Sequence, residues 1–446
     1  MSVSSYSQAK LDKKYHFRIS LQAINSASKL LDGVCEKTSL RHISRLSDEF
    51  RANIFFKRED LQPVRSFKIR GAYNLMASLS EEEKSRGIVA ASAGNHAQGV
   101  ALSCSKLGIY GVIFMPTTAP KQKIDKVKKF GGLFIRIELI GKTVDDALKA
   151  AQEYCNNENA VFVHPFDDER IIAGQGTMAA EIWDQLVSGQ LDRIHSFETQ
   201  NADKPVDIVI VPIGGGGMIA GIASYFKQKN PTIRIIGVEP AGANAMAVSL
   251  QAGSVQRLNT VDTFCDGVAL KSPGNITFEI VRELVDEVIV IEEGQVAKDM
   301  IELYQNEGVI AESSSALTVS ALSHLGEEIR GKNVVCIMSG GNNDIARYPE
   351  VVERSLIWQG LKHYFIVEFA QKPGQLKTFL ESVLGEHVDI VRFEYMKKNN
   401  KETGPAFVGV ELQSAEEYQP LLHRMRESGL SYRSIEAGSD LHQFLV

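Results

Sequence analysis

Residues 208–217 read IVIVPIGGGG, an apolar run followed at once by four consecutive glycines. A continuous apolar run, without alternating polar residues, is typical of a strand buried on both faces of a sheet. Each glycine costs about 1 kcal/mol of conformational freedom relative to alanine, so four together indicate that something needs bare backbone. The segment predicts a buried strand, a tight turn and a helix whose first amide groups bind an anion. A flexible turn without a ligand is the alternative.

The same region could be mistaken for a membrane span, because residues 208–226 carry no charge. Pro212 and the glycines would break a spanning helix near its middle. We therefore expect a soluble chain.

Short apolar runs of the same kind recur along the chain and predict buried strands at residues 54–56, 88–90, 112–115, 235–238, 288–291 and 334–338. Helical patterns lie between them, for example at residues 98–107, 144–153 and 316–325. This alternation predicts an α/β fold with doubly wound sheets.

Composition excludes several classes of protein. The 446 residues are 44% hydrophobic and 23% charged, and 49 Lys and Arg against 55 Asp and Glu give a net charge of −6. Such a balance argues against nucleic acid or an anionic membrane as a partner. The five cysteines are scattered without a C-x-x-C pair, so we expect neither a disulfide framework nor a zinc site. The compartment that we expect for such a chain is the reducing cytoplasm. Residues 1–5 lack the apolar region of a secretory signal.

The pattern changes around residues 348–360. Beyond it, strand-like runs at 364–369, 389–395, 406–412 and 432–435 alternate with helical patterns in the order βαββαβ. That order predicts a ferredoxin-like α+β unit. We expect a domain at 1–355, with two subdomains, and a small domain at 362–446.

Three glycine-containing turns follow predicted strands, at residues 93–96, 214–217 and 339–342. Ligands of open α/β sheets bind beyond the carboxyl ends of the strands, so these turns are expected to converge. Lys68, between Phe67 and Ile69, could be an ordinary surface charge. Burial could also lower its pKa from about 10.4 and make it a nucleophilic amine.

The other two candidate site residues can also be explained without a ligand. Ser339 could cap a turn or could bond a pyridine nitrogen, and Asn95 could be a turn residue or could bond a phenolic oxygen. No acidic residue accompanies the glycines as a dinucleotide site requires, so a single phosphate fits better. An amine for an aldehyde, a cradle for a phosphate and a hydroxyl for a ring nitrogen together indicate pyridoxal phosphate. No well-placed acidic residue is evident that could donate a proton.

Four phrases carry a family resemblance: SFKIRGA at 66–72, SAGNHAQGVA at 92–101, PIGGGGM at 212–218 and SGGN at 339–342. In this order they resemble the fold-type-II pyridoxal-phosphate enzymes, and among these the threonine dehydratases, over about residues 20–350. The resemblance implies two doubly wound subdomains like those of tryptophan synthase β. It also implies covalent binding of the cofactor by Lys68, contact of Asn95 with the phenolic oxygen and of Ser339 with the ring nitrogen. The phosphate would be held by the amides of Gly214, Gly215, Gly216, Gly217 and Met218.

The resemblance implies deamination of L-threonine to 2-oxobutanoate, the first step of isoleucine biosynthesis, with L-serine as a lesser substrate. The C-terminal unit resembles an ACT-like regulatory domain that would respond to isoleucine and valine, and the family suggests a homotetramer. The alternatives are a serine/threonine racemase, a catabolic serine dehydratase, or a non-catalytic amino-acid sensor. The C-terminal unit could also be an oligomerisation module without a ligand. Ala93 stands where the racemases carry a proton-transferring serine, which favours elimination.

Several positions depart from the family pattern. Residues 312–315 read ESSS where relatives often have Glu-Pro-Ser-Gly, and Ser39 replaces a frequent proline. Ala245 stands where related racemases place an aspartate at a cation site, so we predict no metal.

Overall fold

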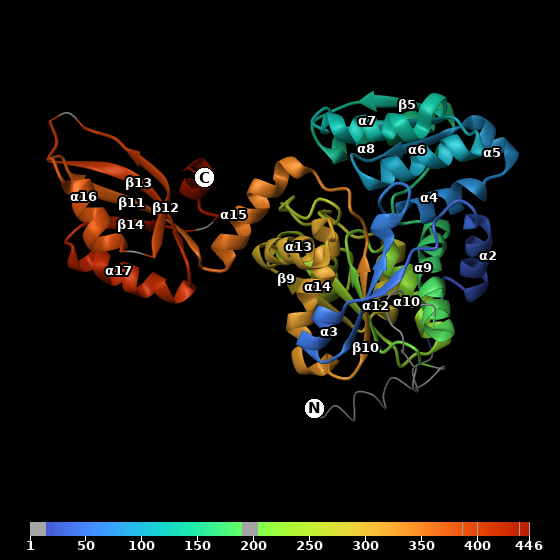
Figure 1. Ribbon diagram of the computed structural model, residues 1–446. Coiled ribbons are helices and arrows are strands. Elements are labelled where there is room, and N and C mark those ends of the chain that lie inside the picture. The colour runs from blue at the N-terminus through green and yellow to red at the C-terminus, as the bar shows by residue number, and fades with distance from the viewer. Residues whose placement is uncertain (1–14, 190–203, 386, 399, 437, 446) are drawn as a thin grey trace. The chain divides into compact units, whose positions relative to one another are not determined.

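The computed structural model describes residues 15–189, 204–385, 387–398, 400–436 and 438–445, so the expectation for residues 1–5 lies outside the described residues. Two compact units make up the chain (Figure 1). The first runs up to Glu293 and includes Glu302–Asn343, and the second joins Gly294–Ile301 to Asp344–Val446. Among the described residues, no helix has the length and apolar character that crossing a membrane requires.

The larger sheet of the first unit contains the strand that precedes the four glycines. Its order is β1-β2-β10-β7-β8-β9, with β1 antiparallel to β2 and all other neighbours parallel. The strands are β1 (Leu40–His42), β2 (Asn53–Arg58), β7 (Ile208–Pro212), β8 (Arg234–Pro240), β9 (Glu287–Ile291) and β10 (Asn333–Met338). Every residue of β7 is buried, as the continuous apolar run predicts.

The smaller sheet is fully parallel, with the order β5-β4-β3-β6. Its strands are β3 (Ile88–Ala91), β4 (Gly111–Met115), β5 (Ile135–Leu139) and β6 (Val161–Phe162). The helices α4 (Lys68–Ala77), α5 (Glu81–Arg86), α6 (Asn95–Leu107), α7 (Lys121–Gly131) and α8 (Val144–Glu158) surround it (Figure 1).

Eight helices of the described residues accompany the larger sheet. They are α2 (Leu21–Leu31), α3 (Ser44–Phe50), α9 (Glu169–Ser188), α10 (Gly217–Lys229), α11 (Ala245–Ala252), α12 (Asn275–Leu284), α14 (Ser313–Leu325) and α13 (Glu293–Glu307), which both units share. In Figure 1, α9, α10 and α12 lie on one side of this sheet, and α3 and α14 on the other. A large apolar core fills the space between α9, α10 and the strands.

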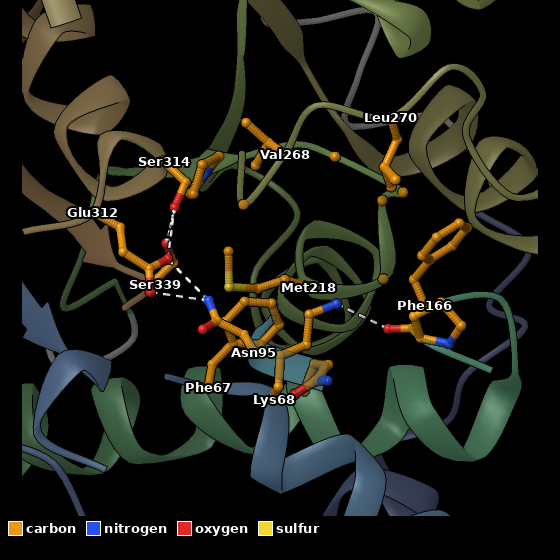
Figure 2. A pocket seen from close by; sticks show the side chains of 18 residues that line it. Phe67, Lys68, Asn95, Phe166, Met218, Val268, Leu270, Glu312, Ser314 and Ser339 are labelled. Carbon is orange, nitrogen blue, oxygen red and sulfur yellow. Dashed lines mark hydrogen bonds between the residues drawn. The ribbon is translucent and has the colours of Figure 1, made fainter. Parts of the chain in front are cut away.

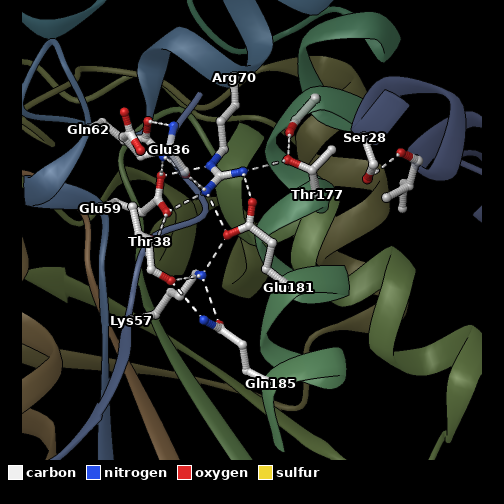
Figure 3. Close-up of polar contacts among 12 residues, drawn as sticks. Ser28, Glu36, Thr38, Lys57, Glu59, Gln62, Arg70, Thr177, Glu181 and Gln185 are labelled. Carbon is white, nitrogen blue, oxygen red and sulfur yellow. Dashed lines mark hydrogen bonds and ion pairs between the residues drawn. The ribbon is translucent and has the colours of Figure 1, made fainter. Parts of the chain in front are cut away.

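A buried ionic cluster ties α4 to β2 and α9 (Figure 3). The Arg70 guanidinium donates to both carboxylate oxygens of Glu59 at 2.7 Å and to those of Glu181 at 2.7 and 3.0 Å. The Lys57 ammonium lies 2.6 Å from Glu181 as well. Arg70, Lys57 and Glu59 are at most 1% exposed. Two cations thus balance two carboxylates, as buried charges require.

The second unit is built on an antiparallel sheet with the order β12-β13-β11-β14. Its strands are β11 (Lys362–Ala370), β12 (Val388–Tyr395), β13 (Thr403–Leu412) and β14 (Ser431–Ile435), and its helices are α15 (Tyr348–Trp358), α16 (Gln375–Phe379), α17 (Tyr418–Glu427) and α18 (Asp440–Leu445). Up to β14 the chain order is the predicted βαββαβ, with α15 before it and α18 after it. The predicted fold class, two α/β sheets followed by a ferredoxin-like α+β unit, is confirmed.

Candidate active site

One pocket of the first unit collects side chains from around both of its sheets (Figure 2). It encloses about 540 Å³, counting the part that is open to solvent. It is lined by Phe67, Lys68, Asn95, Pro165, Phe166, Gln175, Pro212, Gly214, Gly215, Gly216, Gly217, Met218, Gly267, Val268, Leu270, Glu312, Ser314 and Ser339. All the site residues predicted from the sequence are among them. The structure therefore brings them together, while their individual roles stay predictions.

Backbone pairing places Lys68 beside Ser339. Ser66 forms an antiparallel bridge with Gly340, and the amide of Phe67 donates to the carbonyl oxygen of Ser339 at 3.1 Å. Lys68 follows as the first residue of α4, and Ser339 follows β10 directly. Two segments far apart in the sequence are thus aligned so that an amine and a hydroxyl enter the same pocket.

The ammonium of Lys68 lies inside the pocket. Its Nζ donates to the carbonyl oxygen of Pro165 at 3.0 Å and lies 5.2 Å from the ring centre of Phe67. Burial lowers the pKa of Lys68 to about 8, although the nearby Glu312 carboxylate acts in the opposite direction. A lysine with this pKa has a substantial fraction of neutral, nucleophilic amine near neutral pH.

The four glycines form the turn between β7 and α10. A side chain at Gly215 would collide with the ring of Phe166. Gly216 has φ +90°, a conformation that glycine adopts far more readily than other residues. The hydroxyl of Thr277 holds the turn from outside by donating to the carbonyl oxygen of Gly215 at 2.6 Å. The first amides of α10 have no partner within the helix, so this turn suits an anion.

Glu312 is an acidic pocket residue that the sequence reasoning named only as the start of the ESSS run and not as a site residue. It is 4% exposed, and its two oxygens accept hydrogen bonds from the Asn95 amide at 3.0 and 2.9 Å (Figure 2). Its Oε1 also accepts the amide of Asn342 at 2.7 Å. Burial raises the pKa of Glu312 to about 7. The pocket therefore contains an acidic residue that the sequence reasoning did not place there. The available signal was the resemblance of residues 312–315 to a family phrase that begins with Glu.

Ser314 and Ser315, the last two residues of the ESSS run, lie against Ser339, and of these two only Ser315 departs from the family pattern. The hydroxyl of Ser314 is 3.1 Å, and that of Ser315 is 3.2 Å, from the Ser339 hydroxyl. All three side chains are buried. The unusual run of serines is thus part of the surroundings of one predicted cofactor contact.

His96, next to Asn95, is buried outside the pocket lining. Its Nε2 bonds to the carbonyl oxygen of Val163 at 2.9 Å. Burial lowers the pKa of His96 to about 3, so its imidazole is neutral near pH 7.

The residues present fit pyridoxal phosphate. A glycine turn with space only for backbone suits the phosphate, and a partly neutral amine suits the aldehyde. The half-buried amide of Asn95 and the buried hydroxyl of Ser339 suit the polar positions of a ring.

Comparisons with known proteins agree with this fit. The family described as "Pyridoxal-phosphate dependent enzyme" matches residues 31–340, and that described as "C-terminal regulatory domain of Threonine dehydratase" matches residues 353–445. The chain is 46% identical over 428 residues to the biosynthetic L-threonine dehydratase of Bacillus subtilis, covering 96% of this chain and 98% of the relative. It is also 46% identical to that of Corynebacterium glutamicum, over 95% of this chain and 94% of the relative.

Solved structures share the fold of the first unit. The processed threonine deaminase isoform 2 of Solanum lycopersicum is 37% identical with a TM-score of 0.67, covering 79% of this chain and 94% of that protein. Maize serine racemase is 30% identical with a TM-score of 0.66, covering 76% of this chain and 98% of that protein. The predicted family and cofactor are confirmed: the chain belongs to the pyridoxal-phosphate-dependent enzymes and, within them, to the biosynthetic L-threonine dehydratases with a C-terminal regulatory domain.

Proposed function

We propose that the protein converts L-threonine to 2-oxobutanoate and ammonia, as the first step of isoleucine biosynthesis, with L-serine as a lesser substrate. The observation that supports this most is the single pocket in which Lys68, the glycine turn and Ser339 meet. The similarity to biosynthetic L-threonine dehydratases over 96% of the chain supports the choice of substrate.

When bound, the cofactor supplies a ring that withdraws electrons from the Cα carbon of the substrate. Lys68 then accepts the Cα proton on its Nζ, which a pKa of about 8 makes effective near neutral pH. The bond from Cβ to the hydroxyl oxygen breaks and water leaves. Addition of water at Cα then releases ammonia, so that L-threonine becomes 2-oxobutanoate and ammonia without net use of water.

A keto-acid assay tests this proposal. We expect L-threonine to give more product than L-serine at equal concentrations, and L-serine to give almost no D-serine. The reason is that racemisation needs a proton donor on the opposite face of the substrate, and Ala93 has none. The neighbouring Ser92 is not among the residues that line the pocket, and its hydroxyl accepts the Gly94 amide at 3.2 Å. Chiral chromatography measures D-serine. Substantial D-serine would favour the racemase, and faster turnover of L-serine would favour a serine dehydratase.

We place the effector of the regulatory domain in a cavity of the second unit that encloses about 750 Å³, counting the part open to solvent. Its lining includes Phe369, whose ring centre lies 6.1 Å from that of Phe393 and 6.4 Å from that of Tyr395. Lys372 and Lys397 also line it. Aromatic rings suit a branched apolar side chain and a lysine suits a carboxylate, so isoleucine or valine fits this cavity. Such control typically needs a coupling of about 1–3 kcal/mol between the two sites.

Truncation tests the regulatory role. A chain ending at Asn343 is expected to keep threonine deamination and to lose inhibition by isoleucine, because the whole second unit after that residue is removed. A chain ending at Gly360 is the comparison: it keeps α15 but removes Tyr364, whose hydroxyl donates to Glu353 of α15 at 2.5 Å. Isoleucine titrations of both proteins and the full chain provide the measurement. An unchanged inhibition curve in either truncated protein would contradict the proposal.

Three further assignments belong to this proposal. The catalytic domain spans 1–355, which includes most of α15, and the regulatory domain spans 362–446. The protein is a homotetramer, which light scattering tests against four times the 49.1 kDa chain mass. It resides in the reducing cytoplasm, which the free thiols of its cysteines support.

A further inference from the structure

Four pocket residues form one continuous chain of hydrogen bonds (Figure 2). The chain begins at Asn95, whose amide donates to Glu312 at 2.9 and 3.0 Å. The Ser314 hydroxyl lies 3.4 Å from Glu312 Oε2 and 3.1 Å from the Ser339 hydroxyl. Asn95 and Ser339 are the two residues proposed to contact the cofactor ring, at its phenolic oxygen and at its nitrogen. Glu312 therefore lies between the two contact residues. Asn95 donates to it directly, and Ser339 is connected to it through Ser314.

The number of hydrogens on the serines limits how this chain can be arranged. The Ser315 hydroxyl donates its only hydrogen to the Gly340 carbonyl oxygen at 2.8 Å and accepts the Gly340 amide at 3.0 Å. Toward Ser339, at 3.2 Å, Ser315 can therefore only accept. Ser314 has one hydrogen and two possible acceptors, Glu312 and Ser339. Where Ser314 directs that hydrogen decides whether Ser339 receives a hydrogen bond.

The charge on Glu312 controls this choice. An ionised carboxylate attracts the Ser314 hydrogen, and Ser339 then receives no hydrogen bond from Ser314. A protonated carboxyl accepts more weakly, so Ser314 can donate to Ser339. The Ser339 hydroxyl, having accepted that bond, becomes a stronger donor to a third group, because hydrogen bonds in a chain polarise one another.

We propose that Glu312 is a positioning residue that sets the direction of the hydrogen bonds at both ring contacts, through Asn95 on one side and through Ser314 and Ser339 on the other. This inference rests on the proposed function, since it assumes the ring contacts of Asn95 and Ser339. The pKa of about 7 that burial gives Glu312 means that both arrangements are populated near neutral pH.

The charged groups around Glu312 come from three parts of the chain. Asp266, in the segment before α12, raises the pKa of Glu312, and Lys123 of α7 lowers it. Lys68 of α4 is the third, because the charge of Glu312 raises the pKa of that lysine. Lys123 and Asp266 form an ion pair at 2.7 Å, and the effect of Asp266 on the pKa of Glu312 is the larger of the two.

The test is a pH titration of the absorbance of the bound cofactor in the full-length holoenzyme, from pH 6 to pH 9. In the wild-type protein we expect a spectral transition with a midpoint near 7. In Glu312→Gln, an isosteric change without a titratable group, that transition should be absent. In Ser314→Ala it should keep its midpoint and lose part of its amplitude, because only the path to Ser339 is broken. Ser320→Ala, a buried serine of the same helix that bonds to Ala316, is the matched control and should titrate like the wild type.

The outcomes separate this inference from the proposed function. A wild-type protein that binds no pyridoxal phosphate would overturn the proposed function. A wild-type protein that binds it and deaminates threonine, with the same transition in Glu312→Gln, would overturn only the role of Glu312. If Glu312→Gln does not fold, Ser314→Ala decides, and an unchanged amplitude in that variant would overturn the inference.

Discussion

Replacing Lys68 with alanine is expected to reduce the deamination of L-threonine by at least about 10³-fold. Proton transfer by a positioned side chain typically contributes about 10²–10⁴-fold, and this variant also loses the amine that would bind the cofactor covalently. The pocket lining includes no second lysine, so no neighbouring ammonium can take over within the described residues. A variant that retains the phosphate cradle should still bind the cofactor without a covalent link.

Two measurements together check this result. The keto-acid assay gives turnover, and borohydride reduction followed by peptide mass spectrometry shows whether the cofactor is linked to the peptide that contains Lys68. Lys142→Ala is the control, because Lys142 is an exposed lysine outside the pocket and should behave like the wild type. Cofactor found on another lysine, or retained turnover in Lys68→Ala, would contradict the assignment.

The parts of the fold that could be predicted are those in which one local pattern determines the structure. The core strands β7 and β10 are buried over almost their whole length, so their apolar runs are continuous and identify them. The edge strand β5 was not predicted, because its residues are only partly buried or exposed and its apolar positions alternate with Arg136 and Glu138. The sequence predicted a turn at residues 93–96, but helix α6 already begins at Asn95, directly after Gly94.

Glu312 shows why a site is only partly visible in a sequence. Lys68, Asn95 and Ser339 each lie in a phrase that matches the family, whereas Glu312 begins the run ESSS, which departs from the family pattern. Its amide donates to the carbonyl oxygen of Gly340 at 3.0 Å, a long-range backbone contact that brings it into the pocket. Phe166 was missed for a similar reason, because its segment between β6 and α9 has no regular pattern. Contacts of this kind depend on the assembled sheets, and no local pattern encodes them.

Replacing Arg70 with methionine is expected to lower the free energy of unfolding of the first unit by about 3–5 kcal/mol. That is the typical cost of removing one partner from a buried ion pair, because the other charge stays buried without compensation. Here Glu59 loses a bidentate partner at 2.7 Å, and Glu181 keeps only Lys57 as a cation. Denaturant unfolding followed by fluorescence provides the measurement. Arg234→Met is the matched control: Arg234 pairs with the more exposed Glu287 and Glu328, so about 0–1 kcal/mol should be lost.

The double variant Arg70→Met, Glu59→Gln separates the effect of charge from that of packing. Removing both partners leaves Lys57 and Glu181 as a neutral pair at 2.6 Å, so no net charge stays buried in the cluster. The double variant should therefore be more stable than Arg70→Met alone, and the coupling energy of the cycle should be favourable to the native pair. A double variant that is as unstable as the sum of the two single changes would show that Arg70 acts through packing. In that case, the connection between α4 and the larger sheet would depend on shape and not on charge.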